Sequence, residues 1–457
     1  MFKHKSGEQN TAIVLMCVHL FGECTFAPLY LRERSKIWKT GVLIMIIQEE
    51  AMQIIETALH DAKPDEAVKR ALADLPEVSG KIVLVSFGKA AWSMSAAAEH
   101  VLGDKISEGI CITKYGHVQG KIPHVTCYEA GHPVPDENSF SATRKAEALV
   151  HNLSSDDLVL LLVSGGGSAL FEDPLIAPQE LQDITKQLLA CGADITEINI
   201  IRKRLSDVKG GKFAEKCSPA RVFSIVLSDI IGDPLDSIAS GPAYPDSHTC
   251  QEALAIADKY ALKLSDRARS LLNVETPKQL DHVETRITGS VRQLCRSAEN
   301  ECIRLGYQPV FLTSSLNCEA KEAGSFLASI ARDHQNIETS TAWILGGETI
   351  VHLHGSGLGG RNQELVLSAA AGIGDCHDIC IFSIGSDGTD GPTDAAGGIV
   401  DEHTCDNLKS QGISISSVLA DNDSYHALKR AGALVVTGPT GTNVNDLTVL
   451  LIKRKAK

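Results

Sequence analysis

The stretch Leu158-Val-Leu-Leu-Leu-Val-Ser-Gly-Gly-Gly-Ser168 indicates the fold class. A short apolar run that ends in consecutive glycines is typical of a buried strand followed by a tight loop. Similar runs of leucine and β-branched residues occur at residues 82–87, 125–128 and 222–227. Helix-like segments lie between these runs, at residues 90–101, 142–150 and 179–190. This alternation predicts an α/β protein with a largely parallel sheet and crossover helices.

The length of the chain and one polar segment predict two domains. A chain of 457 residues exceeds the size at which one hydrophobic core usually stops growing. Residues 273–288 contain Pro277, many charged or polar residues and few apolar ones, which indicates a linker. We therefore expect one domain at residues 45–283 and a second at residues 284–457. Beyond the linker, strands are expected at residues 309–312, 342–345, 350–353 and 434–437.

Composition limits the classes of function. The formal net charge of -14 argues against a nucleic-acid-binding protein, and an anionic substrate would have to be bound by local cations. The 13 cysteines are scattered without a CxxC motif, which favours reduced thiols in a cytoplasmic protein over a disulfide framework or a zinc site. Residues 11–26 are too short an apolar segment to span a membrane and match a signal peptide poorly. We interpret residues 1–44 as an extension of unknown role that need not belong to the fold.

Polar groups at the ends of the expected strands are candidates for a site. The glycine loop after residue 163 exposes successive backbone N–H groups that can hold phosphate or carboxylate oxygens, although it is not a Walker A sequence. Lys89 follows one strand directly, and Asp229 follows another, where a carboxylate can bind Mg²⁺ or accept a hydroxyl proton. The alternative for each group is an ordinary turn or surface residue. The loop residues are Ser164, Gly165, Gly166, Gly167 and Ser168.

A basic window at residues 199–212 stands out in this acidic chain. It carries a charge of +4, because it contains five cations and a single carboxylate, Asp207. Charge runs are usually solvated helix faces, but the cluster as a whole indicates a funnel for anions. Its cations are Arg202, Lys203, Arg204, Lys209 and Lys212.

A second glycine-rich loop, at residues 386–398, follows the apolar run at residues 379–384. Its carboxylates, Asp387, Asp390 and Asp394, supply hard oxygens that suit Mg²⁺ or a substrate hydroxyl. Their spacing is not that of an EF-hand. The alternative is a solvated turn, since glycine, aspartate and proline are common turn residues.

The segment Gly355-Ser-Gly-Leu-Gly-Gly360 is a literal GxGxxG before a helix-like stretch at residues 362–371. With Asp387 as the acid that binds ribose, it makes an NAD(P)H-dependent reductase a rival hypothesis. Against this hypothesis, Asp387 lies farther on than the usual spacing, and Arg361 follows the last glycine immediately. A reductase would also leave the other candidate groups without a role.

Taken together, these motifs resemble the type 2 glycerate kinases, whose carboxyl-terminal half is the MOFRL domain. The resemblance extends over residues 46–450 in the order of the family's motifs. Its segments are Gly88-Lys-Ala90, Gly131-His-Pro-Val-Pro-Asp136, Ser164-Gly-Gly-Gly-Ser-Ala169, Ile201-Arg-Lys203, Lys209-Gly-Gly211, Leu227-Ser-Asp229, Ala239-Ser-Gly-Pro242, Gly346-Gly-Glu348, Gly359-Gly-Arg-Asn-Gln-Glu364, Gly388-Thr-Asp-Gly-Pro-Thr-Asp-Ala-Ala-Gly-Gly398 and Thr437-Gly-Pro-Thr-Gly-Thr-Asn-Val-Asn-Asp446.

The resemblance implies a fold and an activity. It implies a Rossmann-like amino-terminal domain, a smaller mixed α/β carboxyl-terminal domain, and a site in the cleft between them. The implied activity is transfer of the γ-phosphoryl group of ATP, with Mg²⁺, to D-glycerate, most often giving 2-phosphoglycerate and ADP. The implied protein is cytoplasmic, with no nucleic-acid or membrane partner, and a homo-oligomer is compatible with it.

The positions that match the family's active-site residues are Lys89, Asp229, Arg361 and Asp387. We expect Arg361 to bind the glycerate carboxylate through its planar fork and Lys89 to lie near the transferring phosphoryl group. One of Asp229 and Asp387 would act on the substrate hydroxyl, while the other would support the metal, with Asp394 as a further metal candidate. Substrate or phosphate binding is also expected from the loop at residues 164–168 and from Arg202, Lys209 and Asn362.

Two other hypotheses stay open at this point. One is a hydroxypyruvate reductase that uses NAD(P)H, and the other is a catalytically idle binding protein with the same fold. The choice between a 2- and a 3-phosphate product, the oligomeric state and the metal preference do not follow from the residues.

Overall fold

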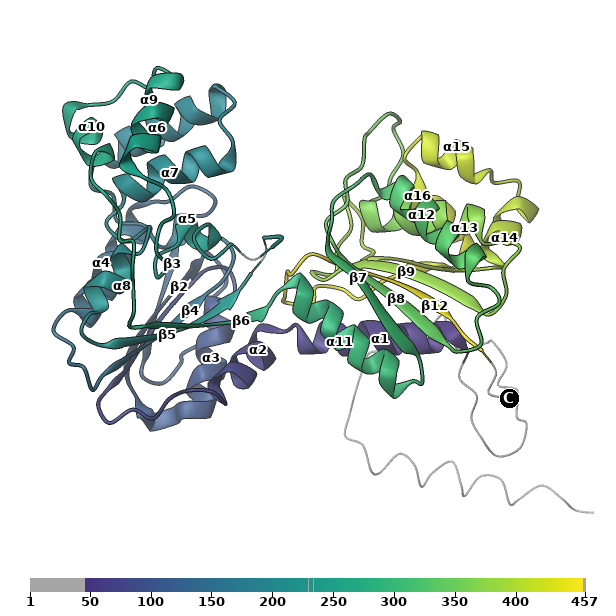
Figure 1. The fold of residues 1–457 in the computed structure, drawn as a ribbon, viewed down its shortest axis with the longest axis horizontal. Coiled ribbons are helices and arrows are strands. Elements are labelled where there is room, and N and C mark those ends of the chain that lie inside the picture. The colour runs from purple at the N-terminus through teal and green to yellow at the C-terminus, as the bar shows by residue number, and fades with distance from the viewer. Residues whose placement is uncertain (1–45, 229, 233, 455–457) are drawn as a thin grey trace, which may run out of the picture. The chain divides into compact units, whose positions relative to one another are not determined.

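The computed structural model describes residues 46–228, 230–232 and 234–454. The extension expected at residues 1–44 and the candidate Asp229 lie outside the described residues. The described chain forms two sheets with helices packed on them, which confirms the predicted α/β class (Figure 1).

The first sheet has six strands, all parallel, in the order β3-β2-β1-β4-β5-β6. The central strands β1 and β4 are buried along their whole length, as expected for the apolar run that starts at Leu158. The chain continues from β1 to β2 and β3 on one side and from β4 to β5 and β6 on the other. The strand order therefore reverses between β1 and β4, as in doubly wound sheets. The strands are β1 (Ile82–Phe87), β2 (Ile106–Lys114), β3 (Val125–Ala130), β4 (Leu158–Val163), β5 (Arg221–Leu227) and β6 (Val283–Gly289).

Helices cover both faces of the first sheet. α2 (Pro64–Leu72) and α3 (Ala91–Leu102) pack on the face that presents Leu84 and Leu160. α4 (Glu137–Val150) and α8 (Lys212–Cys217) pack on the opposite face, which presents Val85. A further helical cluster contains α6 (Pro178–Ala190), α7 (Ile195–Leu205), α9 (Cys250–Lys259) and α10 (Asp266–Leu272). The short helical turns are η1 (Gly103–Lys105), α5 (Gly167–Leu170) and η2 (Ile238–Ser240).

The second sheet is mixed and has the order β11-β10-β9-β12-β8-β7. β7 and β8 are parallel, whereas β12 runs antiparallel to both of its neighbours, and β10 runs antiparallel to β9 and β11. The strands are β7 (Gln308–Leu316), β8 (Thr341–Gly347), β9 (Ile379–Gly385), β10 (Gly397–Asp401), β11 (Leu434–Val435) and β12 (Asp446–Ile452).

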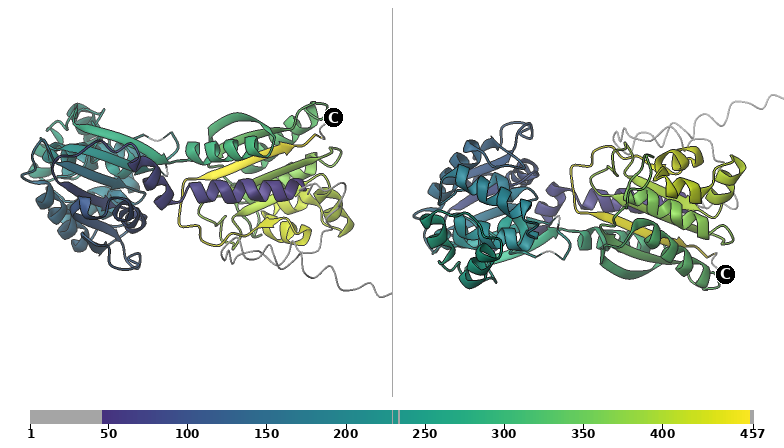
Figure 2. Two further views of the ribbon diagram at one scale, coloured as in Figure 1. Left: turned by 90° about the horizontal axis from the view of Figure 1, so that it is seen from below. Right: turned by 90° about the horizontal axis from the view of Figure 1, so that it is seen from above.

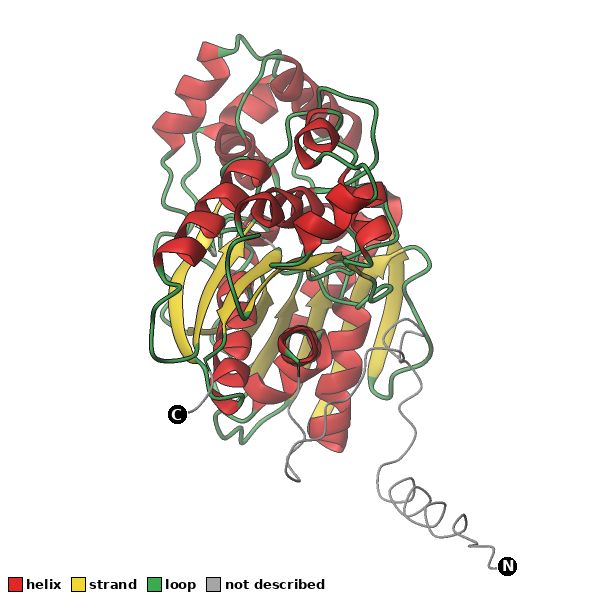
Figure 3. Ribbon diagram, turned by 90° about the vertical axis from the view of Figure 1, so that its right-hand side faces the viewer, coloured by secondary structure: helices red, strands yellow, loops and turns green. Residues whose placement is uncertain are grey.

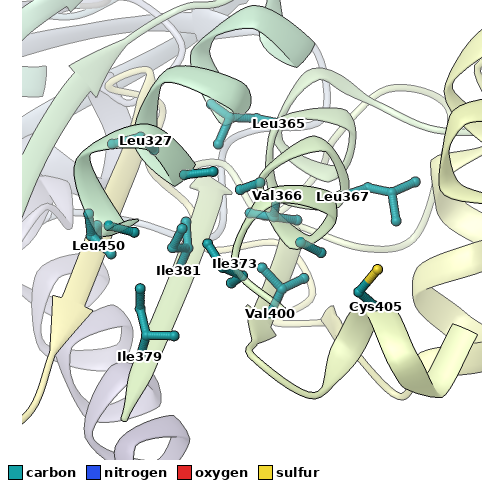
Figure 4. Packing of buried hydrophobic residues seen from close by; sticks show 14 of the residues in the cluster. Leu327, Leu365, Val366, Leu367, Ile373, Ile379, Ile381, Val400, Cys405 and Leu450 are labelled. Carbon is teal, nitrogen blue, oxygen red and sulfur yellow. The ribbon is translucent and has the colours of Figure 1, made fainter. Parts of the chain in front are cut away.

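Two layers of helices enclose the second sheet (Figure 3). On one face, Leu365 and Val366 of α13 pack with Leu327 of α12 over Ile381 and Leu450 of the sheet (Figure 4). The helices of this layer are α12 (Ala320–Asp333), α13 (Arg361–Gly372), α14 (Thr404–Ser410), α15 (Ile415–Ala420) and α16 (Ser424–Ala431).

The opposite face of the second sheet is covered by α11 (Val291–Arg304) and α1 (Ile47–Asp61). Helix α1 is the first described element of the chain, yet it runs along this sheet (Figure 2). Its Ile54 and Ile55 are fully buried with Leu294 of α11 and Phe382 of β9. The predicted domain limits stay predictions, and the core contacts group α1 with the second sheet and β6 with the first.

Two sequence expectations are wrong. The segment expected as a linker, residues 273–288, contributes strand β6, which pairs with β5. Its residues are mostly half-buried and many are polar, as fits a strand at the edge of a sheet. Residues 350–353 form no strand, and only Ile350 makes an isolated bridge, to Glu319.

Among the described helices, none has the length and apolar character that crossing a bilayer requires.

Candidate functional site

The ends of β1 and β4 bring two of the predicted groups together. The backbone N–H of Lys89 donates to the carbonyl of Gly165 at 2.8 Å, and the N–H of Ala90 donates to the Ser164 hydroxyl at 3.1 Å. Ligands of open α/β sheets bind at the carboxyl ends of the strands where the strand order reverses, which is the place of these residues. Lys89 itself is exposed, so its ammonium is open to solvent.

A glycine makes this close approach feasible. Gly88 has a φ of 119°, and a Cβ there would lie 2.2 Å from the Ser164 hydroxyl oxygen and 2.4 Å from the Ser164 carbonyl oxygen. Real Cβ atoms do not approach so closely, and a side chain would strain this backbone conformation. A glycine is therefore required before Lys89, because the loop after β4 contacts the backbone at this position.

The glycine loop after β4 also faces His132. A Cβ on Gly166 would lie 3.0 Å from His132 Nε2 and 3.2 Å from Lys89 Cγ. Farther along the loop, the Ser168 hydroxyl lies 3.0 Å from that of Ser240, which donates to Asn199 Oδ1. The structure thus gathers Lys89, His132 and the loop at residues 164–168 at one sheet edge, and their binding roles stay predictions.

The basic window does not form the expected anion funnel. The side chains of Lys203 and Arg204 are 1% and 0% exposed, and both pair with the fully buried carboxylate of Asp246. Lys212 donates to the carbonyls of Lys203, Arg204 and Ser206, so it satisfies the carboxyl end of α7. The funnel is therefore wrong for these three cations, because each serves a partner within the fold.

The other two cations of the window were predicted to bind substrate or phosphate. Arg202 is half-buried and donates from Nη2 to the carbonyl of Ser168 at 3.1 Å, which ties it to the glycine loop. Lys209 is fully buried, with Nζ 2.8 Å from the Phe171 carbonyl and 3.3 Å from Glu172 Oε2. Burial lowers the pKa of Lys209 to about 8, against the pull of Glu172. Contact of Lys209 with a dissolved anion would require this pair to open.

On the second sheet, Arg361 lies at the start of α13 and faces the start of β12. Its Nε and Nη2 donate to the two carboxylate oxygens of Asp446, at 2.6 and 2.9 Å. Its Nη1 lies 3.2 Å from Glu348 Oε1, just after β8. Asp446 was not singled out as a site residue in the sequence analysis, although it ends a motif of the resemblance, and the apolar run at residues 447–452 could have revealed β12.

Asp390 holds the helix that carries Arg361. Its carboxylate accepts hydrogen bonds from the backbone N–H groups of Asn362 and Gln363, at 3.1 and 2.9 Å. The first N–H groups of a helix have no acceptor within the helix, so Asp390 caps α13 from a loop that is distant in sequence. Burial raises the pKa of Asp390, and these hydrogen bonds act against it. The Asn362 side chain is itself buried between Asp390 and Ser383, so its predicted substrate contact would need those bonds to rearrange.

Asp387 follows β9 and is half-buried. Its Oδ1 accepts from the backbone N–H and the hydroxyl of Thr389, at 2.9 and 3.0 Å. A Cβ on Gly385 would lie 3.5 Å from Asp387 Oδ1 and 3.6 Å from Asp446 Oδ1, so both carboxylates border the same glycine. Asp394 is exposed and accepts from the Tyr425 hydroxyl at 2.7 Å.

The residues present fit a magnesium ion in part. Asp387 offers a carboxylate with a fixed orientation, and Mg²⁺ is commonly held by one or two carboxylates, with water and substrate phosphates as the other ligands. Within the described part of the chain, the two acidic clusters with metal-like spacing each surround a lysine. Lys203 contacts Asp236 and Asp246, and Lys216 contacts Glu147 and Asp207. The metal roles of Asp387, Asp394 and Asp229 stay predictions.

The GxGxxG segment packs against the loop at residues 421–423, and its backbone N–H groups donate hydrogen bonds to that loop. His354 and Gly355 donate their N–H groups to Asn422 Oδ1, and Leu358 donates to Asp423 Oδ1. Cβ atoms on Gly355 or Gly357 would lie within 2.5 Å of the residue 421–423 backbone or side chains. A dinucleotide loop instead leaves its amides to the pyrophosphate, between adjacent parallel strands. Here β8 and β9 are separated by β12, which argues against the reductase hypothesis.

Known proteins resemble this chain in both of its halves. A model of the MOFRL family matches residues 341–446, and a model of a domain of unknown function (DUF4147) matches residues 50–273. The D-glycerate 2-kinase of Thermotoga maritima is 49% identical over 412 residues, which cover 89% of this chain and 98% of that protein.

The crystal structure of a glycerate kinase from Thermotoga maritima has a TM-score of 0.84 and 48% identity, and the match covers 89% of this chain and 99% of that one. A protein of Agrobacterium vitis that is provisionally named a hydroxypyruvate reductase is 38% identical, over 88% of this chain and 93% of its own length. On these matches, with the two sheets and the motifs on them, the chain belongs to the glycerate kinase family and carries the MOFRL domain in its carboxyl-terminal half.

Proposed function

We propose that this protein is a D-glycerate 2-kinase, which transfers the γ-phosphoryl group of ATP to the 2-hydroxyl of D-glycerate and releases ADP. The observation that carries the proposal is the 49% identity to a D-glycerate 2-kinase across 98% of that protein's length. The arrangement of Lys89 and the glycine loop at the point where the strand order of the first sheet reverses supports it, because nucleotides bind there in doubly wound sheets.

In the reaction, the substrate hydroxyl oxygen forms a bond to the γ-phosphorus while the bond to the β–γ bridging oxygen breaks. The hydroxyl proton goes to a carboxylate, for which Asp387 and Asp229 are the candidates. Positioning and charge stabilisation supply most of the rate in such transfers, so the side chains mainly have to orient and neutralise. Lys89, with an exposed ammonium beside the glycine loop, is suited to the transferring phosphoryl group.

Arg361 remains the candidate for the glycerate carboxylate, with a change in the atoms that we assign. Its Nε–Nη2 edge is occupied by Asp446, so the carboxylate would meet the Nη1 side, where Glu348 now lies. A hydrogen bond to a charged group contributes about 1.5–3 kcal/mol, which matters for a substrate this small.

Mg²⁺ would supply charge neutralisation for the phosphates, and whichever of Asp387 and Asp229 does not take the hydroxyl proton would contribute an oxygen ligand to the ion. The Rossmann-like character of the first domain, the cleft between the domains, a cytoplasmic location and a homo-oligomer belong to this proposal as well. The described cysteines are all free thiols, in keeping with a reducing compartment.

A paired assay tests the proposal. Purified protein is incubated with D-glycerate and MgATP, and in parallel with hydroxypyruvate and NADH or NADPH. ADP formation that depends on glycerate supports the kinase. Oxidation of the reduced cofactor would instead support the reductase, and glycerate binding without any turnover would support an idle binding protein.

A further inference from the structure

A buried carboxylate controls the orientation of Arg361. The Asp446 side chain is 6% exposed and accepts hydrogen bonds from both Nε and Nη2 of the guanidinium, and the Arg361 side chain is 33% exposed. Two parallel hydrogen bonds of this kind fix the plane of an arginine as well as its place. The contact involves the one edge of the guanidinium that includes Nε, so it leaves Nη1 pointing away from Asp446.

The backbone at both ends of this contact is itself held firmly. Asp446 begins β12, which pairs along its length with β8 on one side and β9 on the other. Arg361 begins α13, whose first N–H groups are bound by Asp390. A Cβ on Gly360 would lie 2.3 Å from the Asp390 carboxyl carbon, so helix and loop are in direct contact there. The bidentate pair therefore joins two rigid elements rather than two loops.

The exposed edge of Arg361 has a different partner. Glu348 is exposed, with 49% of its side chain accessible, and it reaches only Nη1, at 3.2 Å. Its other oxygen accepts from Asn445 Nδ2 at 3.2 Å. A solvent-accessible ion pair of this kind is weak, whereas removal of one partner of a buried pair costs far more. Of the two carboxylates on Arg361, Glu348 is thus the one that an incoming carboxylate can replace.

We propose that Asp446 is a positioning residue: it binds the Nε–Nη2 edge of Arg361 so that the Nη1 side receives the substrate carboxylate in exchange for Glu348. This inference rests on the proposed function for its kinetic tests, but not for its spectroscopic one. Asp446 does not contact the substrate in this arrangement. Glu348 occupies the position on Arg361 that the substrate carboxylate takes over.

The main test is a double-mutant cycle on the full-length protein. Asp446→Asn is expected to lower kcat/KM for glycerate by about 10- to 150-fold, the loss of one charged hydrogen bond, mainly through KM, with the KM for ATP unchanged. In an Arg361→Lys background the same change should cost less than about 3-fold, because lysine has no fork to orient. Equal losses in both backgrounds would overturn the proposal.

Asp401→Asn is the matched control. Asp401 is a carboxylate of the same sheet that accepts hydrogen bonds from the Gln48 side chain and the Thr404 hydroxyl, so its removal also costs hydrogen bonds without touching Arg361. It should leave the KM for glycerate unchanged. A rise in this KM as large as that of Asp446→Asn would show that general loss of stability, not orientation of Arg361, explains the effect.

Glu348→Gln tests the exchange in a variant that keeps the buried pair and should fold. With the resident charge removed, the KM for glycerate is expected to fall, by about 2- to 5-fold for a weak exposed pair. A rise in KM of tenfold or more would assign the positioning role to Glu348 instead and refute the assignment to Asp446.

An arm without turnover separates this inference from the proposed function. The Nε–H signal of Arg361 in ¹H–¹⁵N spectra is identified by its loss in Arg361→Lys. It should shift and exchange faster with water in Asp446→Asn, and stay in place in Asp401→Asn and Glu348→Gln. An unmoved signal in Asp446→Asn contradicts the inference, whether or not glycerate is phosphorylated. A shifted signal in a protein that forms no ADP contradicts only the proposed function.

Discussion

The buried pair of Lys209 and Glu172 should contribute strongly to the free energy of unfolding. Both side chains are 0% exposed, and the Lys209 ammonium lies 3.3 Å from Glu172 Oε2. Neither Glu172 oxygen accepts a hydrogen bond from the described residues, so Lys209 is the group that compensates its charge. In Lys209→Met the carboxylate stays buried without that compensation, which costs about 3–5 kcal/mol of unfolding free energy. That is a large fraction of the about 5–15 kcal/mol typical of a folded domain.

The pair can be separated from its individual charges by a double variant. Lys209→Met combined with Glu172→Gln removes both charges and should recover most of the loss. The Phe171 carbonyl would still lack its donor, so about 1–3 kcal/mol is expected to remain. Lys216→Met is the control, because Lys216 is 34% exposed and bridges Glu147 and Asp207 near the surface. Its substitution should cost about 1 kcal/mol or less.

Unfolding in urea, followed by circular dichroism at pH 7, measures these differences, and steady-state kinetics at a temperature where each variant is folded measures binding. Lys209→Met should keep the KM for ATP and for glycerate within about twofold, since the ammonium faces the interior. A variant that loses less than 1 kcal/mol but binds either substrate tenfold more weakly would refute the structural role and restore the predicted contact with an anion.

Three further predictions concern the candidate groups on the two sheets. Gly88→Ala should lower both stability, by about 1–3 kcal/mol, and turnover, because the new Cβ collides with Ser164; an alanine variant with unchanged melting temperature and kcat would contradict the strained approach of β1 and β4. Arg361→Lys should raise the KM for glycerate at least tenfold and leave the KM for ATP unchanged, as initial-rate kinetics can show, and unaltered glycerate kinetics would remove Arg361 from the carboxylate site. Burial raises the pKa of Asp446 to about 6. The nearby Asp390 also raises this pKa, whereas Arg361 and Asn362 lower it. Below that pH, protonation of Asp446 should loosen Arg361. kcat/KM for glycerate should then fall by up to about tenfold per pH unit as the pH drops below 6, and Asp446→Asn should lack this limb; a limb that persists in the variant belongs to another group.

Much of the fold could be predicted because its central strands are continuous apolar runs. The run from Leu158 forms β4, and the run at residues 379–384 forms most of β9, each buried along its whole length. Strand β6 was missed because it lies at the edge of its sheet, where half-buried polar residues obscure the pattern. Strand β12 was missed although its sequence is largely apolar, because no helix separates it from β11 and it does not fit the alternation of strand and helix.

The candidate site was predictable in its parts but not in its ion pairs. The place of Lys89 beside the Ser164 loop follows from their positions at the ends of neighbouring strands. The partners of the basic window could not be inferred, because Asp246 lies more than 40 residues from Lys203 and Arg204 along the chain. The contact of Arg361 with Asp446 spans 85 residues, and only the pairing of β12 between β8 and β9 brings the two together.

The proposed function of this chain is phosphorylation of D-glycerate at the 2-hydroxyl. The most direct measurement follows D-glycerate with MgATP and the full-length protein by ¹H-coupled ³¹P NMR. We expect a new phosphomonoester signal that is split into a doublet by the single proton on C2 and that grows in step with ADP. A triplet, from the two protons on C3, would correct the position of transfer, and the absence of any phosphoester of glycerate, in protein that is folded and binds ATP, would contradict the proposed function.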